Sequence, residues 1–408
     1  MALVVFLLTY VFLAGFKLPW IKLDRTGAAL VGAAAMVGLG IIPPNEVAQA
    51  VDVDTIVLLL GMMLLAAYLT RAAFFRATAY YVLRHSKTPR GLLFALVMIS
   101  GVLSAFLVND TVCLMLTPLV LMLVKSADLP PLPYLLGLCM ASNAGSAATF
   151  TGNPQNMIIG VASQMPYAQF IAFMALPALL SMGVVFLVLL YAFRKELPHR
   201  SIHPDGPPPL VDRRLLVICS IAVVGILIAF FVGLPLSWSA LVGATAVMVV
   251  AGINPEEQYK KLDLGLLLFF ACLFIVVHGV NKEGWAIAMR DLFAPLMVGG
   301  PIRESFGFTA LTLVASNLFS NVPFVMLARV WVPGMVDPRL GWQVLALAST
   351  LAGNLTLIGS VANLIVFEGA KDTIKVSFWQ YFRIGAPATL ISLVIGLAVL
   401  LAERALFL

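Results

Sequence analysis

Polar residues that could bind a small solute are concentrated in short breaks within long apolar stretches of the chain. The longest break, residues 142–156, reads Ser-Asn-Ala-Gly-Ser-Ala-Ala-Thr-Phe-Thr-Gly-Asn-Pro-Gln-Asn. Glycine permits unusual backbone angles, and Pro154 lacks an amide hydrogen and breaks a helix. Asparagine, serine and threonine supply uncharged hydrogen-bond donors and acceptors. This composition favours a solute site over helix packing with small and polar residues, which does not need Gly-Asn-Pro-Gln-Asn together.

A carboxylate lies in the other break of the first half, Asn109-Asp110-Thr111, which precedes residues 142–156 in the chain. Asp110 is the one acidic residue inside the apolar runs 91–124 and 133–163. An ionisable side chain at bilayer depth is costly and usually has a function. We predict that Asp110 couples transport to a proton or helps to hold sodium. The alternative is a carboxylate that caps the following helix, and the two roles are compatible.

The second half of the chain contains two matching breaks, Ser320-Asn321-Val322-Pro323 and residues 353–363. Val322 stands where the first half has Asp110, so the two halves are chemically unequal. The residues that we predict to bind substrate are Asn109, Thr111, Ser142, Asn143, Thr149, Gly152, Asn153, Asn156, Asn321, Asn354, Thr356, Gly359, Ser360 and Asn363. We expect no catalytic residue, no bound metal and no cofactor.

Charged and thiol groups are sparse around the first-half breaks. No Lys or Arg falls between 91 and 124 or between 133 and 193, so these segments offer no fixed cation for a strongly charged anion. Helix N-termini remain available for a weakly charged group. The four cysteines lie in apolar runs without a CxxC or Cys/His pattern, which indicates neither disulfides nor zinc. A thiolate site for a soft metalloid is the alternative.

The elements that position these residues must be membrane helices. Of the 408 residues, 62% are hydrophobic and 11% are charged, against about 25% charged in a typical soluble domain. This composition excludes an ordinary soluble enzyme, a disordered chain and a nucleic-acid-binding protein. A membrane β-barrel would show short alternating segments instead. Apolar stretches that approach the roughly 20 residues of a span are 2–16, 27–42, 54–74, 167–193, 214–232, 238–252, 263–282 and 378–402.

An internal repeat relates the two halves of the chain. Ala-Leu-Val-Gly-Ala occurs at 29–33 and again at 240–244, and Thr149, Gly152 and Asn156 match Thr356, Gly359 and Asn363. We predict a first repeat at 1–193, a polar linker at 194–213 and a second repeat at 214–408. Each repeat has five spans, of which the broken stretches 133–163 and 340–370 are one each. Each repeat also has a re-entrant hairpin, at 91–124 and at 304–332. With five spans in each, the second repeat is inverted relative to the first.

The orientation follows from the distribution of basic residues. With the N-terminus outside, 19 of the 25 Lys and Arg residues fall on the cytoplasmic side, as the positive-inside rule requires. The other six are Lys282, Arg290, Arg303, Arg329, Arg339 and Arg404. The linker 194–213 is then cytoplasmic, and we expect a multi-pass protein of a bacterial-type plasma (inner) membrane.

The order of these motifs resembles the ion transporter superfamily, which includes arsenite efflux pumps, plant silicon efflux transporters, sodium/proton antiporters and divalent anion/sodium symporters. Asn109-Asp110 with Leu116-Thr117-Pro118 is similar to the arsenite pumps. The runs 142–156 and 352–366, with Ser320-Asn321-Val322-Pro323, resemble the silicon efflux branch. The resemblance implies an all-α carrier of the elevator type. The divalent anion symporters have Ser-Asn-Thr at both hairpin tips, and this chain departs from that pattern.

We therefore predict a cation-coupled secondary transporter that exports a small metalloid hydroxide, silicic acid or arsenite, in exchange for protons. A site of amides, hydroxyls and backbone dipoles fits such solutes, which are uncharged near neutral pH. The alternatives are a sodium- or proton-coupled anion or dicarboxylate symporter and a sodium/proton antiporter. An intramembrane enzyme and a channel are further alternatives from other classes. The partners we expect are a small inorganic solute and the lipid bilayer, without nucleic acid, and a homodimer is compatible with this interpretation.

Overall fold

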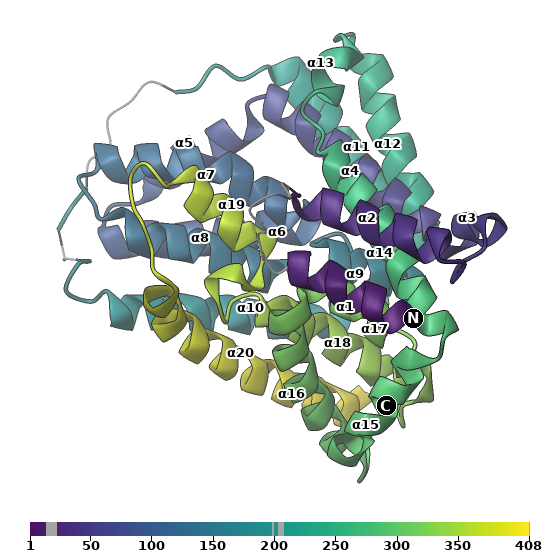
Figure 1. The fold of residues 1–408 in the computed structure, drawn as a ribbon. Helices are drawn as coiled ribbons and strands as arrows, with labels where there is room; N and C mark the ends of the chain where they lie inside the picture. Colours follow the sequence, from purple (N-terminus) through teal and green to yellow (C-terminus); the bar gives the residue numbers. More distant parts are fainter. Residues whose placement is uncertain (14–22, 198–199, 203–207, 408) are drawn as a thin grey trace.

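The computed structural model describes residues 1–13, 23–197, 200–202 and 208–407 (Figure 1). The end of the expected span 2–16 and parts of the expected linker 194–213 lie outside the described residues. Within the described ranges the chain is helical and contains no β-strand. Seven described helices are long and apolar enough to cross a membrane, and two shorter apolar helices accompany them. The prediction of an all-α membrane protein is confirmed.

The first half of the chain forms ten α-helices and one short 3-10 helix, within the described residues. Their bounds are α1 (Ala2–Leu13), α2 (Arg25–Gly38), η1 (Pro44–Glu46), α3 (Val47–Ala50), α4 (Val53–Arg71), α5 (Phe74–His85), α6 (Pro89–Phe106), α7 (Asn109–Ser126), α8 (Pro131–Ser146), α9 (Pro154–Ser163) and α10 (Tyr167–Ala192).

The second half follows the same order. Its helices are α11 (Arg213–Val232), α12 (Leu236–Ala251), α13 (Pro255–Tyr259), α14 (Leu264–Lys282), α15 (Trp285–Met297), α16 (Pro301–Phe319), α17 (Asn321–Ala328), η2 (Val332–Gly334), α18 (Pro338–Ala352), η3 (Leu357–Gly359), α19 (Val361–Gly369) and α20 (Phe378–Phe407). The helices α4 and α14 have the same length, 19 residues. The inverted symmetry between the halves stays a prediction.

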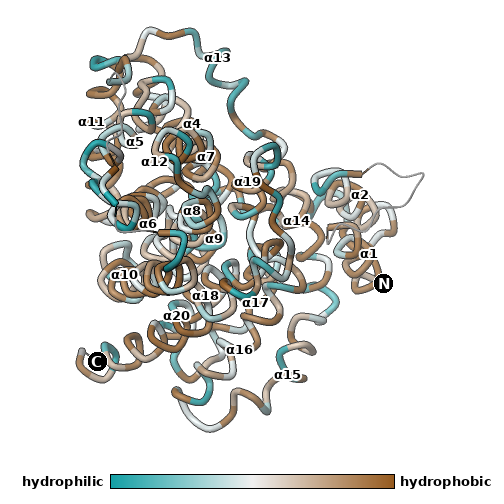
Figure 2. Tube along the Cα trace, turned by 90° about the vertical axis from the view of Figure 1, so that its left-hand side faces the viewer, coloured by the Kyte–Doolittle hydropathy of each residue, from teal (hydrophilic) through white to brown (hydrophobic). Residues whose placement is uncertain are grey.

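The helices separate into two groups, which we call the arm and the body. The arm comprises α1–α4 and α11–α14, and the body comprises α5–α10 and α15–α20. Inside the arm one helix of each half packs on helices of the other half. Helix α4 packs on α11 and α12, and α14 packs on α1 and α2. Figure 2 shows these two sets on opposite sides of the molecule. Helices α4 and α14 also touch the body, so they lie at the boundary between the groups.

Aspartate side chains start the arm helices. Asp24, Asp52, Asp212 and Asp263 each precede a helix and accept a hydrogen bond from the backbone N–H three residues later, at 2.8–3.1 Å. Such a cap satisfies an N–H group that has no partner inside the helix and contributes about 1 kcal/mol. The helix starts at Arg25, Val53, Arg213 and Leu264 are therefore set by local sequence.

In the body, too, helices of one half pack on helices of the other. Helix α19 of the second half packs on α7 of the first, and α9 of the first half packs on α17 and α18 of the second. The long helices α10 and α20 pack on each other and support α8 and α18. This arrangement brings the four breaks of the sequence into one region of the protein.

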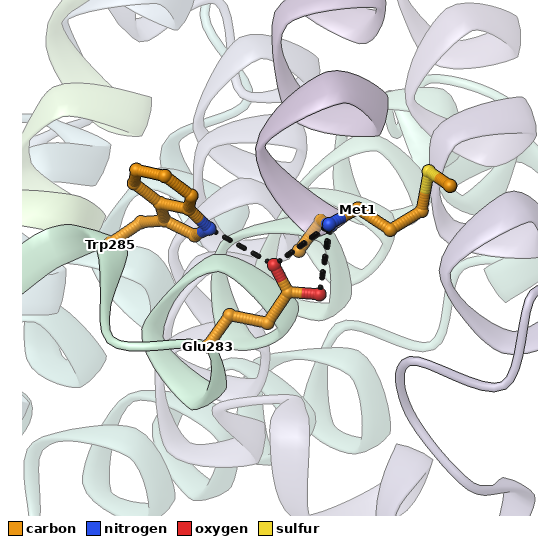
Figure 3. A network of polar contacts seen from close by, with 4 residues as sticks. Met1, Glu283 and Trp285 are labelled. Carbon is orange, nitrogen blue, oxygen red and sulfur yellow. Dashed lines mark hydrogen bonds and ion pairs between the residues drawn. The ribbon is translucent and has the colours of Figure 1, made fainter.

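One end of the arm is tied together by Glu283, which follows α14. Its carboxylate accepts hydrogen bonds from the N–H of Ala2, from the Met1 amino group and from the Trp285 indole (Figure 3). These donors, the Ala2 N–H first, lower the pKa of Glu283 from its usual value of 4.5. The contact holds the start of α1 against the end of α14.

The structure refines where the helices break. Helix α8 continues through Ser142 and Asn143 to Ser146, and the backbone is non-helical between 147 and 153. The first hairpin breaks at Leu107 and Val108, before Asn109, and the second at the single residue Ser320. The second half-helices therefore begin at Asn109 and Asn321, and the residues before them, Val108 and Ser320, make no side-chain cap hydrogen bond.

Candidate functional site

Some of the predicted polar residues line a cavity of about 290 Å³ at the boundary between arm and body, and the others lie behind its wall. The body contributes the starts of α7, α9, α17 and α19, and the arm contributes α1, α2 and α14. Of the residues predicted from the sequence, Asn109, Asp110, Asn321 and Ser360 line this cavity. Arg25 and Asp263 are exposed at its edge, so the cavity opens on the side where α2 and α14 begin.

Asn109 is fixed by three hydrogen bonds. Its backbone N–H donates to the carbonyl of Gly152 at 2.9 Å, and its own carbonyl accepts from the Ser142 hydroxyl at 3.3 Å. Its side-chain Nδ2 donates to Asn143 Oδ1 at 3.1 Å. Among the described residues the Asn109 Oδ1 has no hydrogen-bond partner, although it is fully buried. A buried polar atom without a partner is unusual and indicates a place for a ligand or water.

Asn143 joins the two halves of the protein. Its Nδ2 donates to Asn354 Oδ1 at 2.9 Å and to Asn363 Oδ1 at 3.1 Å. Its Oδ1 accepts from Asn109 Nδ2 and from the Ser360 hydroxyl at 3.0 Å. All these side chains are buried, from 0 to 7% exposed. The network connects the two breaks of the first half with the break at 353–363, which lies more than 200 residues later in the sequence.

Backbone carbonyls determine the orientation of every amide in this network. Asn363 Nδ2 donates to the carbonyls of Gly353 and Thr356, and Asn354 Nδ2 donates to the carbonyl of Met140. Because a carbonyl can only accept, Asn354 and Asn363 must turn their oxygens towards Asn143. Asn143 then turns its oxygen towards Asn109, a residue of the cavity wall whose own Oδ1 is buried and left without a partner in the described chain. The site therefore offers a hydrogen-bond acceptor at this point.

Asn156 and Asn363 hold the broken segments in shape in the same way. Asn156 Nδ2 donates to the carbonyls of Ser146 and Thr149, at 3.2 and 2.9 Å, which lie ten and seven residues earlier. Asn363 Nδ2 donates to carbonyls at the same two spacings, at 2.7 and 3.1 Å. Both residues bind their own loop and neither lines the cavity.

The remaining predicted residues support the loops behind the cavity wall. Asn153 caps α9 and donates to the Ser146 hydroxyl at 2.8 Å, and Ser142 shares a hydrogen bond with Ser104 at 2.6 Å. The Thr149 hydroxyl donates to the carbonyl of Ala105, and the Thr356 hydroxyl donates to Asn317 Oδ1 at 3.0 Å.

Two of the predicted glycines lie where side chains would collide. A Cβ at Gly152 would overlap the carbonyl of Ser146, and one at Gly359 would lie 2.9 Å from Asn317 Oδ1. Thr111 lines a second cavity of about 170 Å³ beside the first.

The second hairpin tip is strained. Ser320 has φ +72° and ψ +152°, a backbone region that residues other than glycine rarely adopt and that costs about 1–3 kcal/mol. The next residue, Asn321, is buried, and its Oδ1 lacks a hydrogen-bond partner in the described part of the chain. Like Asn109 it is the first residue of its half-helix and lines the cavity. The strain holds Asn321 at the cavity wall.

The arm contributes three residues that the sequence motifs did not indicate. Tyr10 of α1 lines the cavity with a buried hydroxyl that finds no partner among the described residues. Its ring packs edge-on against Phe319 with 5.5 Å between the ring centroids. Arg25 and Asp263 flank the opening. They come from single positions outside any repeated break, so no local pattern could have identified them.

Asp110 lies between the two cavities and lines both, as does Asp263. Asp110 is half-buried, and Lys261 stands at the edge of the second cavity. The segments 91–124 and 133–193 supply no cation, as expected, but the folded protein brings Arg25 from the arm to the edge of the same cavity. The expectation of a site without a fixed cation therefore applies to the inner wall and not to the opening.

A polar cavity formed by broken helices from two halves of a membrane protein is the arrangement of a secondary transporter. The sequence profile of the citrate transporter (CitMHS) family matches residues 10–352, and the chain belongs to this family, within the ion transporter superfamily. The family and the relatives found are transporters and not enzymes.

Two curated relatives cover nearly the whole chain. The silicon efflux transporter LSI3 of Oryza sativa subsp. japonica is 31% identical, over 93% of this chain and 93% of its own. The putative transporter arsB of Dictyostelium discoideum is 27% identical, over 97% of this chain and 91% of its own.

A solved structure has a similar fold. The YdaH transporter of Alcanivorax borkumensis, described as having an unusual topology, aligns with a TM-score of 0.61 over 99% of this chain and 97% of its own, at 17% identity.

Proposed function

We propose that this protein is a proton-coupled carrier that exports a small uncharged metalloid hydroxide such as silicic acid or arsenous acid. The observation that supports it is the orientation of the asparagine network, which leaves the Asn109 Oδ1 as a buried acceptor without a partner among the described residues, in a residue that lines the cavity. A solute with several hydroxyl groups can donate to this oxygen and to the Asn321 Oδ1. A carboxylate or an oxyanion offers mainly acceptors and cannot donate to either of these oxygens.

The cavity also suits a small solute by size and charge. About 290 Å³ accommodates a molecule of a few heavy atoms with several waters. The inner wall near Asn109 and Asn321 is uncharged apart from Asp110, which lies beside Asn109. The names of the rice and Dictyostelium relatives agree with a metalloid solute.

Asp110 is our candidate for coupling. It is the acidic residue of the first hairpin, it lines both cavities, and it adjoins a residue that faces the solute. A carboxylate in this position can bind a proton on one side of the membrane and release it on the other. We further propose that the body moves against the arm as an elevator, that the N-terminus lies outside, and that the cavity opens to the cytoplasm of a bacterial inner membrane.

A sodium-coupled anion symporter is the second candidate. Arg25 at the cavity opening could attract an anion, and the amide oxygens of Asn109 and Asn321 are ligands that sodium accepts. The family name, citrate transporter, points in the same direction.

Transport by purified protein in proteoliposomes distinguishes the two. Vesicles with a pH gradient and no sodium are given silicic acid, arsenous acid or citrate, each at the same concentration. We expect accumulation of at least one metalloid hydroxide above its equilibrium level and none of citrate. Accumulation of citrate that requires sodium, without metalloid transport, would replace our proposal with the second candidate.

A further inference from the structure

The cavity opens on one side of the protein, and an ion pair joins arm and body on the other. Thr26 at the start of α2 donates to the carbonyl of Gly265 at the start of α14, so these two helix starts lie together at the cavity opening. At the other end of the arm Lys282, the last residue of α14, pairs with Glu46 at 2.6 Å. Asp52, which caps α4, belongs to this second end.

Asp52 and the opening lie at opposite ends of α4. Thr70 of α4 lines the second cavity together with Asp263. Because a helix rises 1.5 Å per residue, Asp52 lies about 27 Å further along this helix. Asp52 therefore lies on the side of the protein opposite the cavity opening.

Arg329 reaches from the body to Asp52. Its Nη1 donates to Asp52 Oδ2 at 3.2 Å, and its guanidinium lies 5.6 Å from the ring centroid of Phe274 in α14. The side chains are 26% and 14% exposed, so water screens the pair only in part. Arg329 ends α17, the helix that begins with Asn321 at the cavity wall. A single short helix thus connects the ion pair to the solute site.

This contact is unusual in its position. Of the ion pairs between described residues, the pair of Asp52 with Arg329 is the one that joins an arm helix to a body helix. Asp263 caps α14 as Asp52 caps α4, at the matching place of the other half. At the open side Asp263 has no ion-pair partner within the described chain and lines the cavities. The capping aspartate therefore has an ion-pair partner at Asp52, on the side opposite the opening. At Asp263, beside the opening, it has none among the described residues.

We propose that Asp52 and Arg329 form a gate that keeps the solute path closed on the side opposite the cavity, and that this ion pair must break before solute is released there. The pair positions α17 against α4 and α14 and thereby holds Asn321 in the state seen here. The proposal rests on alternating access and does not depend on which solute is carried.

Labelling of an introduced cysteine tests the gate. Val322→Cys places a thiol in the cavity wall, and the four native cysteines are buried. A membrane-impermeant maleimide is applied to each side of sealed vesicles in turn. In the parent we expect reaction from the Asp263 side and slow reaction from the Asp52 side. Asp52→Asn keeps the helix cap but removes the charge, and Arg329→Gln removes the partner. Each should raise labelling from the Asp52 side roughly two- to fivefold.

Matched variants separate a gate from a general loss of stability. Arg329→Lys keeps the charge and should label like the parent. Glu46→Gln breaks an ion pair at the same end of the molecule but inside the arm, and should change nothing. The double variant of Asp52→Asn and Arg329→Gln should label no faster than either single one, because both remove the same contact. Unchanged labelling in both single variants, or an equal increase in Glu46→Gln, would overturn the gate.

Discussion

At the scale of residues, the proposed function depends on the direction in which the asparagine side chains point. The carbonyls of Gly353, Thr356 and Met140 fix Asn354 and Asn363, these fix Asn143, and Asn143 fixes Asn109. Asparagine is needed at Asn143, Asn354 and Asn363 because each of these side chains donates one hydrogen bond and accepts another. An amide cannot be replaced here by a carboxylate of the same shape.

Asn143→Asp tests this directly. The variant keeps the shape of the side chain but places an oxygen against the oxygens of Asn354 and Asn363. We expect a loss of about 2 kcal/mol or more in the free energy of unfolding, because buried acceptors lose their donors. Solute binding should weaken as well. The melting temperature in detergent and solute binding are the measurements, and Asn254→Asp, at an exposed helix cap, is the control. Parent-like stability would show that the network does not hold the site.

Ser320→Gly tests the strain at the second tip. Glycine adopts a positive φ without penalty, so we expect a net gain of about 1 kcal/mol in the free energy of unfolding. Because the strain positions Asn321, transport should become slower. Ser316→Gly, inside α16, is the control and should lose about 1 kcal/mol instead, since glycine weakens a helix interior. Destabilisation by Ser320→Gly would mean that the backbone there is not strained.

At the scale of elements, the breaks need glycine as much as asparagine. The loop after α8 folds back so closely that Gly152 meets the backbone of Ser146. Gly152→Ala should therefore displace the loop, cost roughly 1–3 kcal/mol of stability and abolish transport, since Asn109 donates to the Gly152 carbonyl. Gly183→Ala in α10 has open space around it and should be neutral or slightly stabilising. The measurements are thermal unfolding and flux of both variants. Equal stability and flux in Gly152→Ala and Gly183→Ala would contradict this interpretation.

The sequence predicted these elements unevenly. Apolar runs located the long helices, and the repeated Asn, Gly and Thr located the breaks, because both signals are local. The ends of the breaks were less well predicted, since Ser142 and Asn143 are held in α8 by tertiary hydrogen bonds that no local pattern records. The short helices α5 and α15 occupy segments expected only to connect spans.

At the scale of the whole molecule, arm and body make different contributions. The body carries the residues that the sequence motifs identified, including Asn109, Asp110 and Asn321. The arm closes the cavity with Tyr10, Arg25 and Asp263, whose roles follow from folding alone because each comes from a single position in a distant helix. A sequence read without coordinates could therefore find one wall of the site and not the other.

Movement of the body against the arm would carry Asn109 and Asn321 away from Tyr10, Arg25 and Asp263. The solute would then be exposed in turn to the two sides of the membrane. In this account Asp110 moves with the solute, and its proton is exchanged at each side. In this proposal the body carries the residue that couples proton and solute movement. The contacts between body and arm determine on which side of the membrane the solute is released.

The most direct test of this account is flux driven by a pH gradient in proteoliposomes containing Asp110→Asn. Asp110 lies in the first turn of α7, where no side-chain cap hydrogen bond forms, and asparagine preserves its shape but cannot change its charge. We expect the parent to accumulate the metalloid hydroxide against its gradient, and Asp110→Asn only to equilibrate it, with solute binding retained. Normal concentrative flux in Asp110→Asn would contradict the role of Asp110 as proton carrier, and loss of a sodium dependence alone would make it a sodium ligand instead.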